Sequence, residues 1–243
     1  MLFRSPLIDG LDRVEDITLV TDVPANLCDR LVAGETDLSL CSVIDQQVSS
    51  RPLELVPVGQ IGCDGETRTV ALFSRVPLEE IEEVACDVES HTSVALVQVL
   101  LAERTGRRPR VTPFPGPSEA TPDSVLLIGD KVARLAPSAA SHPHRVDLGL
   151  AWKELTGLPF VFAAWFRLAD AVDEELLEPV ERVLVHRPHH VELVHQEVDE
   201  RAARRAYANL LSAGNHPLGT LSIVAVVVVQ SEPTCCLRNQ LRG

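Results

Sequence analysis

Hydrophobic and polar residues alternate, or gather in short apolar runs, in a pattern that predicts β-strands separated by helices. In the first part of the chain we expect strands at residues 17–20, 37–44, 53–58 and 68–74. A helix is expected at residues 25–33, where Gly34 can end it. After Pro77 a short acidic turn leads into a further strand, expected at residues 84–88.

The second part of the chain begins with the strongest helical segment, residues 92–103, which is apolar almost all round and is ended by Gly106. Such a helix is typical of one that packs against a covered sheet. The elements expected after it are strands at 110–112 and 124–128, helices at 131–135 and 148–156, and a strand at 160–167. Strands and helices therefore alternate along most of the chain.

This alternation predicts an α/β protein with mostly parallel sheets and two lobes, because the chain leaves one sheet near Ser74 and returns near Phe160. We expect residues 1–75 and 160–243 to form the first lobe and residues 76–159 the second, with a cleft between them. Ligands of open α/β sheets bind at the carboxyl ends of the strands. That rule selects the loops after Leu40, Val88 and Ile128.

Composition and charge limit the classes of molecule that the chain can bind. The chain has 243 residues, 45% of them hydrophobic, and a net charge of −13, which argues against nucleic acid but leaves room for a small anion in a local site. The longest aliphatic run, residues 223–229, is far shorter than the roughly 20 residues of a membrane helix. We therefore expect a cytoplasmic protein with no membrane contact. The six scattered cysteines indicate buried, reduced thiols.

A candidate anion site lies where the predicted strand 84–88 leads into the helix at 92–103. The connecting residues include Ser90, Thr92 and Ser93. Free backbone N–H groups at a helix N-terminus, together with hydroxyls, can bind a carboxylate. The same residues could equally serve only as the cap of the helix.

Three other positions could contribute chemistry. Gly129 and Asp130 end the predicted strand 124–128, where the glycine would let a ligand approach and the aspartate could take a proton, although a plain strand-end turn explains both. Thr69 and Arg68 could contact a carboxylate, or could belong to a surface hairpin. A histidine-rich tract, residues 186–195, has no standard metal-ligand spacing, so we expect no metal site.

Several segments of the chain form a recognisable set. They are Thr92-Ser93-Val94-Ala95-Leu96, Leu127-Ile128-Gly129-Asp130, Asp147-Leu148-Gly149 with Trp152, and above all Glu154-Leu155-Thr156-Gly157-Leu158-Pro159-Phe160-Val161-Phe162-Ala163 with Trp165. Taken together, these segments resemble the chorismate dehydratase family of the futalosine route to menaquinone. The resemblance covers roughly residues 6–181 and fades beyond.

The resemblance implies a type II periplasmic-binding-protein-like fold and a lyase that removes water from chorismate, giving 3-[(1-carboxyvinyl)oxy]benzoate without a cofactor. It implies that Thr92 and Ser93, with Ser90, bind a carboxylate and that Gly129 and Asp130 face the cleft. Asp130 is the candidate for the proton acceptor. Two alternatives remain open: 1,4-dihydroxy-6-naphthoate synthase of the same pathway, and a non-catalytic module that binds a small anion.

The chain departs from the family pattern in the first lobe. Phe3 stands where the family has an active-site asparagine, and Val43-Ile44-Asp45 replaces a Ser-Ile-Glu segment, which leaves Ser42 or Ser39 as the nearby hydroxyl donors. From about Arg182 the tail no longer resembles the family. We therefore expect the first residues and the tail to be incomplete or artefactual.

Overall fold

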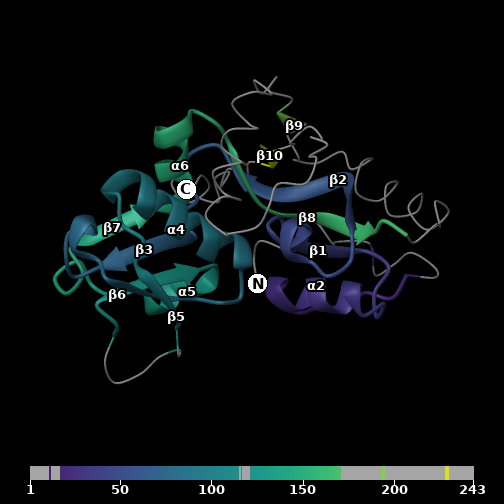
Figure 1. Cartoon of the computed structure of the whole chain (residues 1–243), viewed down its shortest axis with the longest axis horizontal. Helices are drawn as coiled ribbons and strands as arrows, with labels where there is room; N and C mark the ends of the chain where they lie inside the picture. Colours follow the sequence, from purple (N-terminus) through teal and green to yellow (C-terminus); the bar gives the residue numbers. More distant parts are fainter. Residues whose placement is uncertain are drawn as a thin grey trace, which may run out of the picture.

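A computed structural model describes residues 11, 17–114, 116, 121–170, 193–194 and 228–229 of the chain. Two groups of elements lie side by side in it (Figure 1). One is built on a five-stranded sheet and the other on a three-stranded sheet. A further two-stranded ladder joins β9 (Leu193–Val194) to β10 (Val228–Val229).

The five-stranded sheet has the strand order β5-β4-β6-β3-β7. Its strands are β3 (Val70–Ser74), β4 (Glu83–Cys86), β5 (Arg110–Pro113), β6 (Ser124–Ile128) and β7 (His144–Asp147). β4 runs parallel to β5 and β6, whereas β3 is antiparallel to both β6 and β7. The 3-10 turn η2 (Leu78–Glu80) connects β3 to β4.

The inner strands of this sheet are buried on both faces, to which their successive side chains point in turn. Leu72 and Leu126 pack on the face covered by α4 (His91–Thr105) and α6 (Leu148–Thr156). Phe73 and Leu127 pack on the other face, against α5 (Asp130–Leu135). The near-continuous apolar runs in β3 and β6 are therefore explained by burial on two sides.

The three-stranded sheet has β8 (Phe160–Leu168) in the middle, antiparallel to β1 (Ser39–Ser42) on one side and to β2 (Leu53–Cys63) on the other. Helix α2 (Pro24–Val32) packs beside β1 and β8, with Leu31 fully buried between them. The short helix α3 (Asp45–Val48) follows β1 directly. In Figure 1, α2 lies below β1, whereas β2 forms the upper edge strand of the same sheet.

The predicted two-lobed α/β fold is confirmed, and several elements have their expected bounds. Strand β6 and helix α6 agree to the residue, and Gly106 and Gly157 end α4 and α6 in the left-handed conformation, with φ of 69° and 75°. The four cysteines among the described residues are free and buried, as expected. Within the described residues, no helix is long and apolar enough to cross a membrane.

Three structural expectations are wrong. The sheets are not mostly parallel, because β8 returns between β1 and β2 as an antiparallel strand and β3 pairs antiparallel with both of its neighbours. Residues 17–20 do not form a strand. The boundary at residue 75 is also misplaced: β3 is an inner strand of the five-stranded sheet, so the chain crosses between the sheets before Val70. Residues 1–10 and most of the tail lie outside the described residues.

Candidate functional site

The first turn of α4 is built from hydroxyl side chains. Ser90 is the N-cap residue, and its Oγ accepts a hydrogen bond from the Ser93 backbone N–H at 3.3 Å. The Ser90 and Ser93 hydroxyls also lie 3.1 Å apart. Ser90, Thr92 and Ser93 are all buried, with Thr92 completely inaccessible. The two interpretations of this segment are therefore compatible: Ser90 caps the helix, and two further hydroxyls lie beside the cap.

Contacts from the other sheet reach this helix start. The Ile44 N–H, just after β1, donates to Thr92 Oγ1 at 3.4 Å, and His91 Nδ1 lies 2.6 Å from Asp45 Oδ1. The loop before the helix is held too, since the Ala25 N–H at the start of α2 donates to the Glu89 carbonyl at 3.1 Å. The loops after β1 and β4 therefore meet, as the strand-end rule predicts for two of the three selected loops.

The pair Asp45–His91 is asymmetric in its exposure. The Asp45 side chain is 2% exposed, whereas the His91 side chain is 45% exposed. The hydrogen bond to Asp45 raises the pKa of His91 and outweighs partial burial, which lowers it. Within the described part of the chain, Asp45 Oδ2 and the buried Ser42 Oγ have no hydrogen-bond partner. Two buried polar atoms near the junction of the sheets are thus available to a ligand or water.

This pair predicts a pH-dependent contribution to stability. Because the pKa of His91 is raised on folding, its bond to Asp45 stabilises the fold fully below the unfolded value of about 6.5, and this is lost as the pH rises through the folded pKa. Solvent screens a half-exposed histidine, so we expect under about 1 kcal/mol. Urea unfolding of wild type and of His91→Gln at a series of pH values from 5.5 upward measures it: the difference between them should shrink as pH rises. A constant difference would contradict the assignment.

The loop after β6 approaches the same region through Lys131. Its ammonium lies 2.9 Å from Asp87 Oδ1 and 2.8 Å from Glu89 Oε1, in the loop between β4 and α4. Burial opposes the charge of Lys131, but the hydrogen bonds to Glu89 and Asp87 outweigh it and raise the pKa of the ammonium. Gly129 precedes α5 with a φ of 58°, and Asp130 is exposed in its first turn. All three selected loops are therefore near neighbours.

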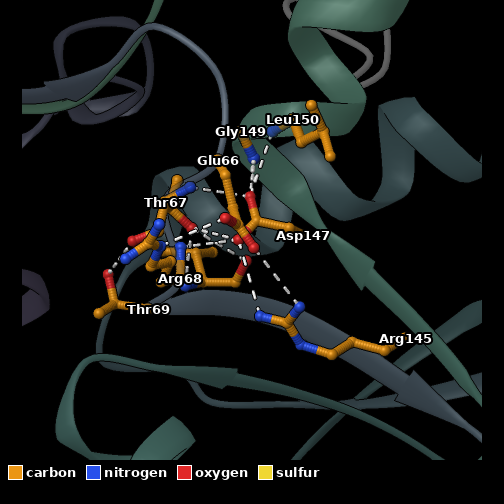
Figure 2. Close-up of polar contacts among 9 residues, drawn as sticks. Glu66, Thr67, Arg68, Thr69, Arg145, Asp147, Gly149 and Leu150 are labelled. Carbon is orange, nitrogen blue, oxygen red and sulfur yellow. Dashed lines mark hydrogen bonds and ion pairs between the residues drawn. The ribbon is translucent and has the colours of Figure 1, made fainter.

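Thr69 belongs to a separate polar cluster around Asp147, the N-cap residue of α6 (Figure 2). Asp147 Oδ1 accepts from the N–H groups of Thr67, Gly149 and Leu150 at 3.0–3.1 Å. Its Oδ2 accepts from the Arg68 N–H at 2.7 Å and from the Thr67 hydroxyl at 3.1 Å.

This cluster ties the turn that precedes β3 to the start of α6. Arg68 takes a φ of 62°, which is uncommon for a residue with a side chain. The Thr69 hydroxyl donates to the Thr67 carbonyl at 3.3 Å, and the Thr69 carbonyl accepts from the Gly129 N–H at 2.7 Å. Thr69 is thus connected to the third selected loop through its backbone, while its side chain is used within the turn.

The structure thus brings Ser90, Thr92 and Ser93 to one junction between the sheets. Ser42 ends β1 two residues before the Ile44 contact, Gly129 and Asp130 belong to the adjoining loop of Lys131, and the Thr69 side chain lies in a different cluster. The pair of Asp45 and His91 was not predicted, because 46 residues separate them and no local pattern connects them. The described residues contain no group of three side chains that could hold a metal ion. The histidine-rich tract lies outside them.

Comparison with known proteins gives matches over most of the chain. A family model described as menaquinone biosynthesis matches residues 4–214. A chorismate dehydratase from Thermus thermophilus is 36% identical over 169 residues, an alignment that covers 63% of this chain and 62% of that relative. The chain thus spans less than two thirds of that relative's length. A crystal structure of an Archaeoglobus fulgidus protein is similar in fold, with a TM-score of 0.53 and 13% identity over 86% of this chain and 76% of that one.

Proposed function

Because this chain belongs to the menaquinone biosynthesis family, we propose that it is a lyase that converts chorismate to 3-[(1-carboxyvinyl)oxy]benzoate and water. The 36% identity to a chorismate dehydratase supports this choice of substrate. The structural observation that carries it is the junction at the start of α4. There, three hydroxyl residues and a histidine meet the residues that follow β1 in the other sheet, Ile44 and Asp45.

Recognition of the substrate follows from the charge at this helix start. Chorismate carries two carboxylates, and the first turn of α4 offers hydroxyl donors beside the positive end of a 15-residue helix. Ser90, Thr92 and Ser93 would hold one carboxylate. The buried Ser42 hydroxyl, which has no partner within the described residues, would face the ligand from the opposing sheet. Gly129 would let the ring approach the adjoining loop without a side chain in the way.

The main requirement that this reaction places on the protein is to orient the substrate ring. Loss of the ring hydroxyl and a ring proton makes the ring aromatic, which supplies the driving force. The protein then has to hold the ring so that the breaking C–H bond faces a base and the leaving hydroxyl faces a proton donor. This requirement is compatible with a site made only of side chains, so we propose no cofactor and no metal.

Incubation of the purified chain with chorismate tests the proposal. We expect the chorismate absorbance to decay while the aromatic enol ether appears in equal amount by chromatography and mass spectrometry. A rise in melting temperature without turnover would instead support a module that only binds the anion. If chorismate is not turned over and the melting temperature does not change, chorismate is not the ligand. A product derived from a naphthoate precursor but not from chorismate would favour the naphthoate-forming enzyme.

Thr92 has two expected roles that one substitution separates. Thr92→Val keeps the shape of the side chain but removes the acceptor for the buried Ile44 N–H. We expect stability to fall by about 1–3 kcal/mol and chorismate affinity by about 1.5–3 kcal/mol, the usual contribution of a hydrogen bond to a charged group. Thr92→Ser retains the hydroxyl and should restore both. Calorimetric titration and urea unfolding measure the two effects; unchanged affinity with lowered stability would make Thr92 purely structural.

A further inference from the structure

We propose that His91, oriented by Asp45, is the general base that removes the ring proton of the substrate. This proposal rests on the proposed function, which leaves the proton acceptor unassigned apart from the exposed carboxylate of Asp130. His91 would act at its Nε2 atom, and Asp45 would be a positioning residue that holds the ring from the opposite side.

The geometry of the pair is that of an oriented imidazole. Asp45 Oδ1 lies 2.6 Å from His91 Nδ1, so the carboxylate accepts the Nδ1–H and leaves the Nε2 lone pair free to accept a proton. Within the described residues, no hydrogen bond or ion pair involves Nε2. The His91 side chain is 45% exposed. The imidazole is therefore fixed at one nitrogen and accessible at the rest of the ring.

The burial of Asp45 strengthens its stabilisation of the protonated His91 ring. The Asp45 side chain is 2% exposed, and among the described residues its other oxygen has no donor, so His91 is the one side chain that hydrogen-bonds this carboxyl group. A carboxylate in such a place stabilises the imidazolium that forms on proton uptake. The other titratable groups that act on His91 are Cys28 and Asp29 of α2, which favour the imidazolium more weakly.

The position of His91 relative to the proposed carboxylate site supports the same role. His91 is the first residue of α4 and lies between Ser90 and Thr92, so a ligand held by those hydroxyls would have its ring within reach of the imidazole. The positive end of the helix disfavours a permanent imidazolium, which helps return the ring to its neutral form after each turnover. Imidazole is also a stronger base than the exposed carboxylate of Asp130, by more than about two pKa units in the unperturbed groups.

The proton balance of the step closes without a co-reactant. His91 Nε2 takes the ring proton as the C–H bond breaks, and the electron pair of that bond enters the ring. The C–O bond to the hydroxyl then breaks, and the imidazolium returns the proton to the departing oxygen, which leaves as water. Asp45 keeps its hydrogen bond to Nδ1 throughout and takes no part in the proton transfer. His91 therefore begins and ends the cycle neutral.

Kinetics of His91→Gln and Asp45→Asn against pH test the proposal. We expect kcat of His91→Gln for chorismate to fall by about 10²–10⁴-fold with little change in KM, and its pH profile to lose the rise that accompanies deprotonation of the base. Asp45→Asn should show a smaller fall in kcat, with that rise moved to lower pH, because loss of the carboxylate makes the imidazole easier to deprotonate. NMR titration of the His91 ring should show the same displacement.

The control is His144→Gln, which removes an imidazole from β7, away from Asp45, and should keep wild-type kinetics. A kcat of His91→Gln within threefold of wild type would overturn the assignment of the base, as would an unmoved pH profile in folded Asp45→Asn. If Asp45→Asn fails to fold, the His91→Gln result decides. Inactivity of the wild-type chain would overturn the proposed function and this step together, whereas an active wild type with an active His91→Gln overturns this step alone.

Discussion

Replacing Asp147 with alanine is expected to lower the free energy of unfolding by about 3–5 kcal/mol, since it removes a buried carboxylate that accepts several hydrogen bonds. The donors left behind include three backbone N–H groups of the α6 cap and of the turn at Thr67, and the N–H of Arg68 in its left-handed conformation. The bond from the Gly149 N–H is buried and the other three are partly buried, so water can replace the carboxylate only in part. Urea unfolding followed by circular dichroism measures the loss.

Two further variants show whether the hydrogen bonds are the cause. Asp147→Asn keeps the shape and one carbonyl acceptor, so it should recover part of the loss. Asp123→Ala removes an exposed carboxylate whose ion pair with Arg75 is at the surface, and its effect should stay within about 0.5 kcal/mol. If Asp147→Ala unfolds like Asp123→Ala, the carboxylate is not what holds the turn to α6.

The second large effect is expected from Gly149→Ala. A methyl group at Gly149 would lie 2.5 Å from Cys63 Sγ, from the Gly65 carbonyl oxygen and from Thr67 Cγ2. One of these is backbone, so the clash cannot be relieved by turning side chains alone. We expect a loss of about 3 kcal/mol, at the upper end of the usual cost of overpacking. Thermal and urea unfolding measure it.

Two further variants distinguish the steric clash at Gly149 from the backbone strain of a left-handed residue. Gly34→Ala places a methyl group in open space at a φ of 73° and should cost only the strain of the left-handed conformation, about 1–2 kcal/mol. Adding Thr67→Ser to Gly149→Ala removes one of the three clashing atoms and should restore part of the stability. Equal losses in Gly34→Ala and Gly149→Ala, with no recovery in the double variant, would show that close packing at α6 is not limiting.

Elements with strong local signals were predicted from the sequence, and elements that depend on distant partners were not. Strand β6 is a continuous apolar run, and α6 has an aspartate at its start and a glycine after its end, so their limits are local properties. Strand β7 was missed because His144 and Arg145 interrupt its hydrophobic alternation. Residues 17–20, three of which are β-branched, form no strand in the structure.

The direction of the strands could not be derived locally, since an apolar run is compatible with parallel and antiparallel pairing. The position of β3 inside the five-stranded sheet depends on β6 and β7, which come 50 or more residues later. The same holds for the candidate site. Ser90 as a helix cap is visible in the sequence, whereas the contact of His91 with Asp45 exists only once both sheets have formed.

The position of β8 also sets an order for folding during synthesis. All five strands of the larger sheet lie within residues 70–147, so that sheet can close as soon as this stretch has left the ribosome. Strands β1 and β2 emerge earlier but must wait for β8, the strand that joins them, which is made last of the three. Until then both carry unpaired edges, which are sites for association with other chains. Of the two larger sheets, the one whose first strands are made earlier is therefore completed later.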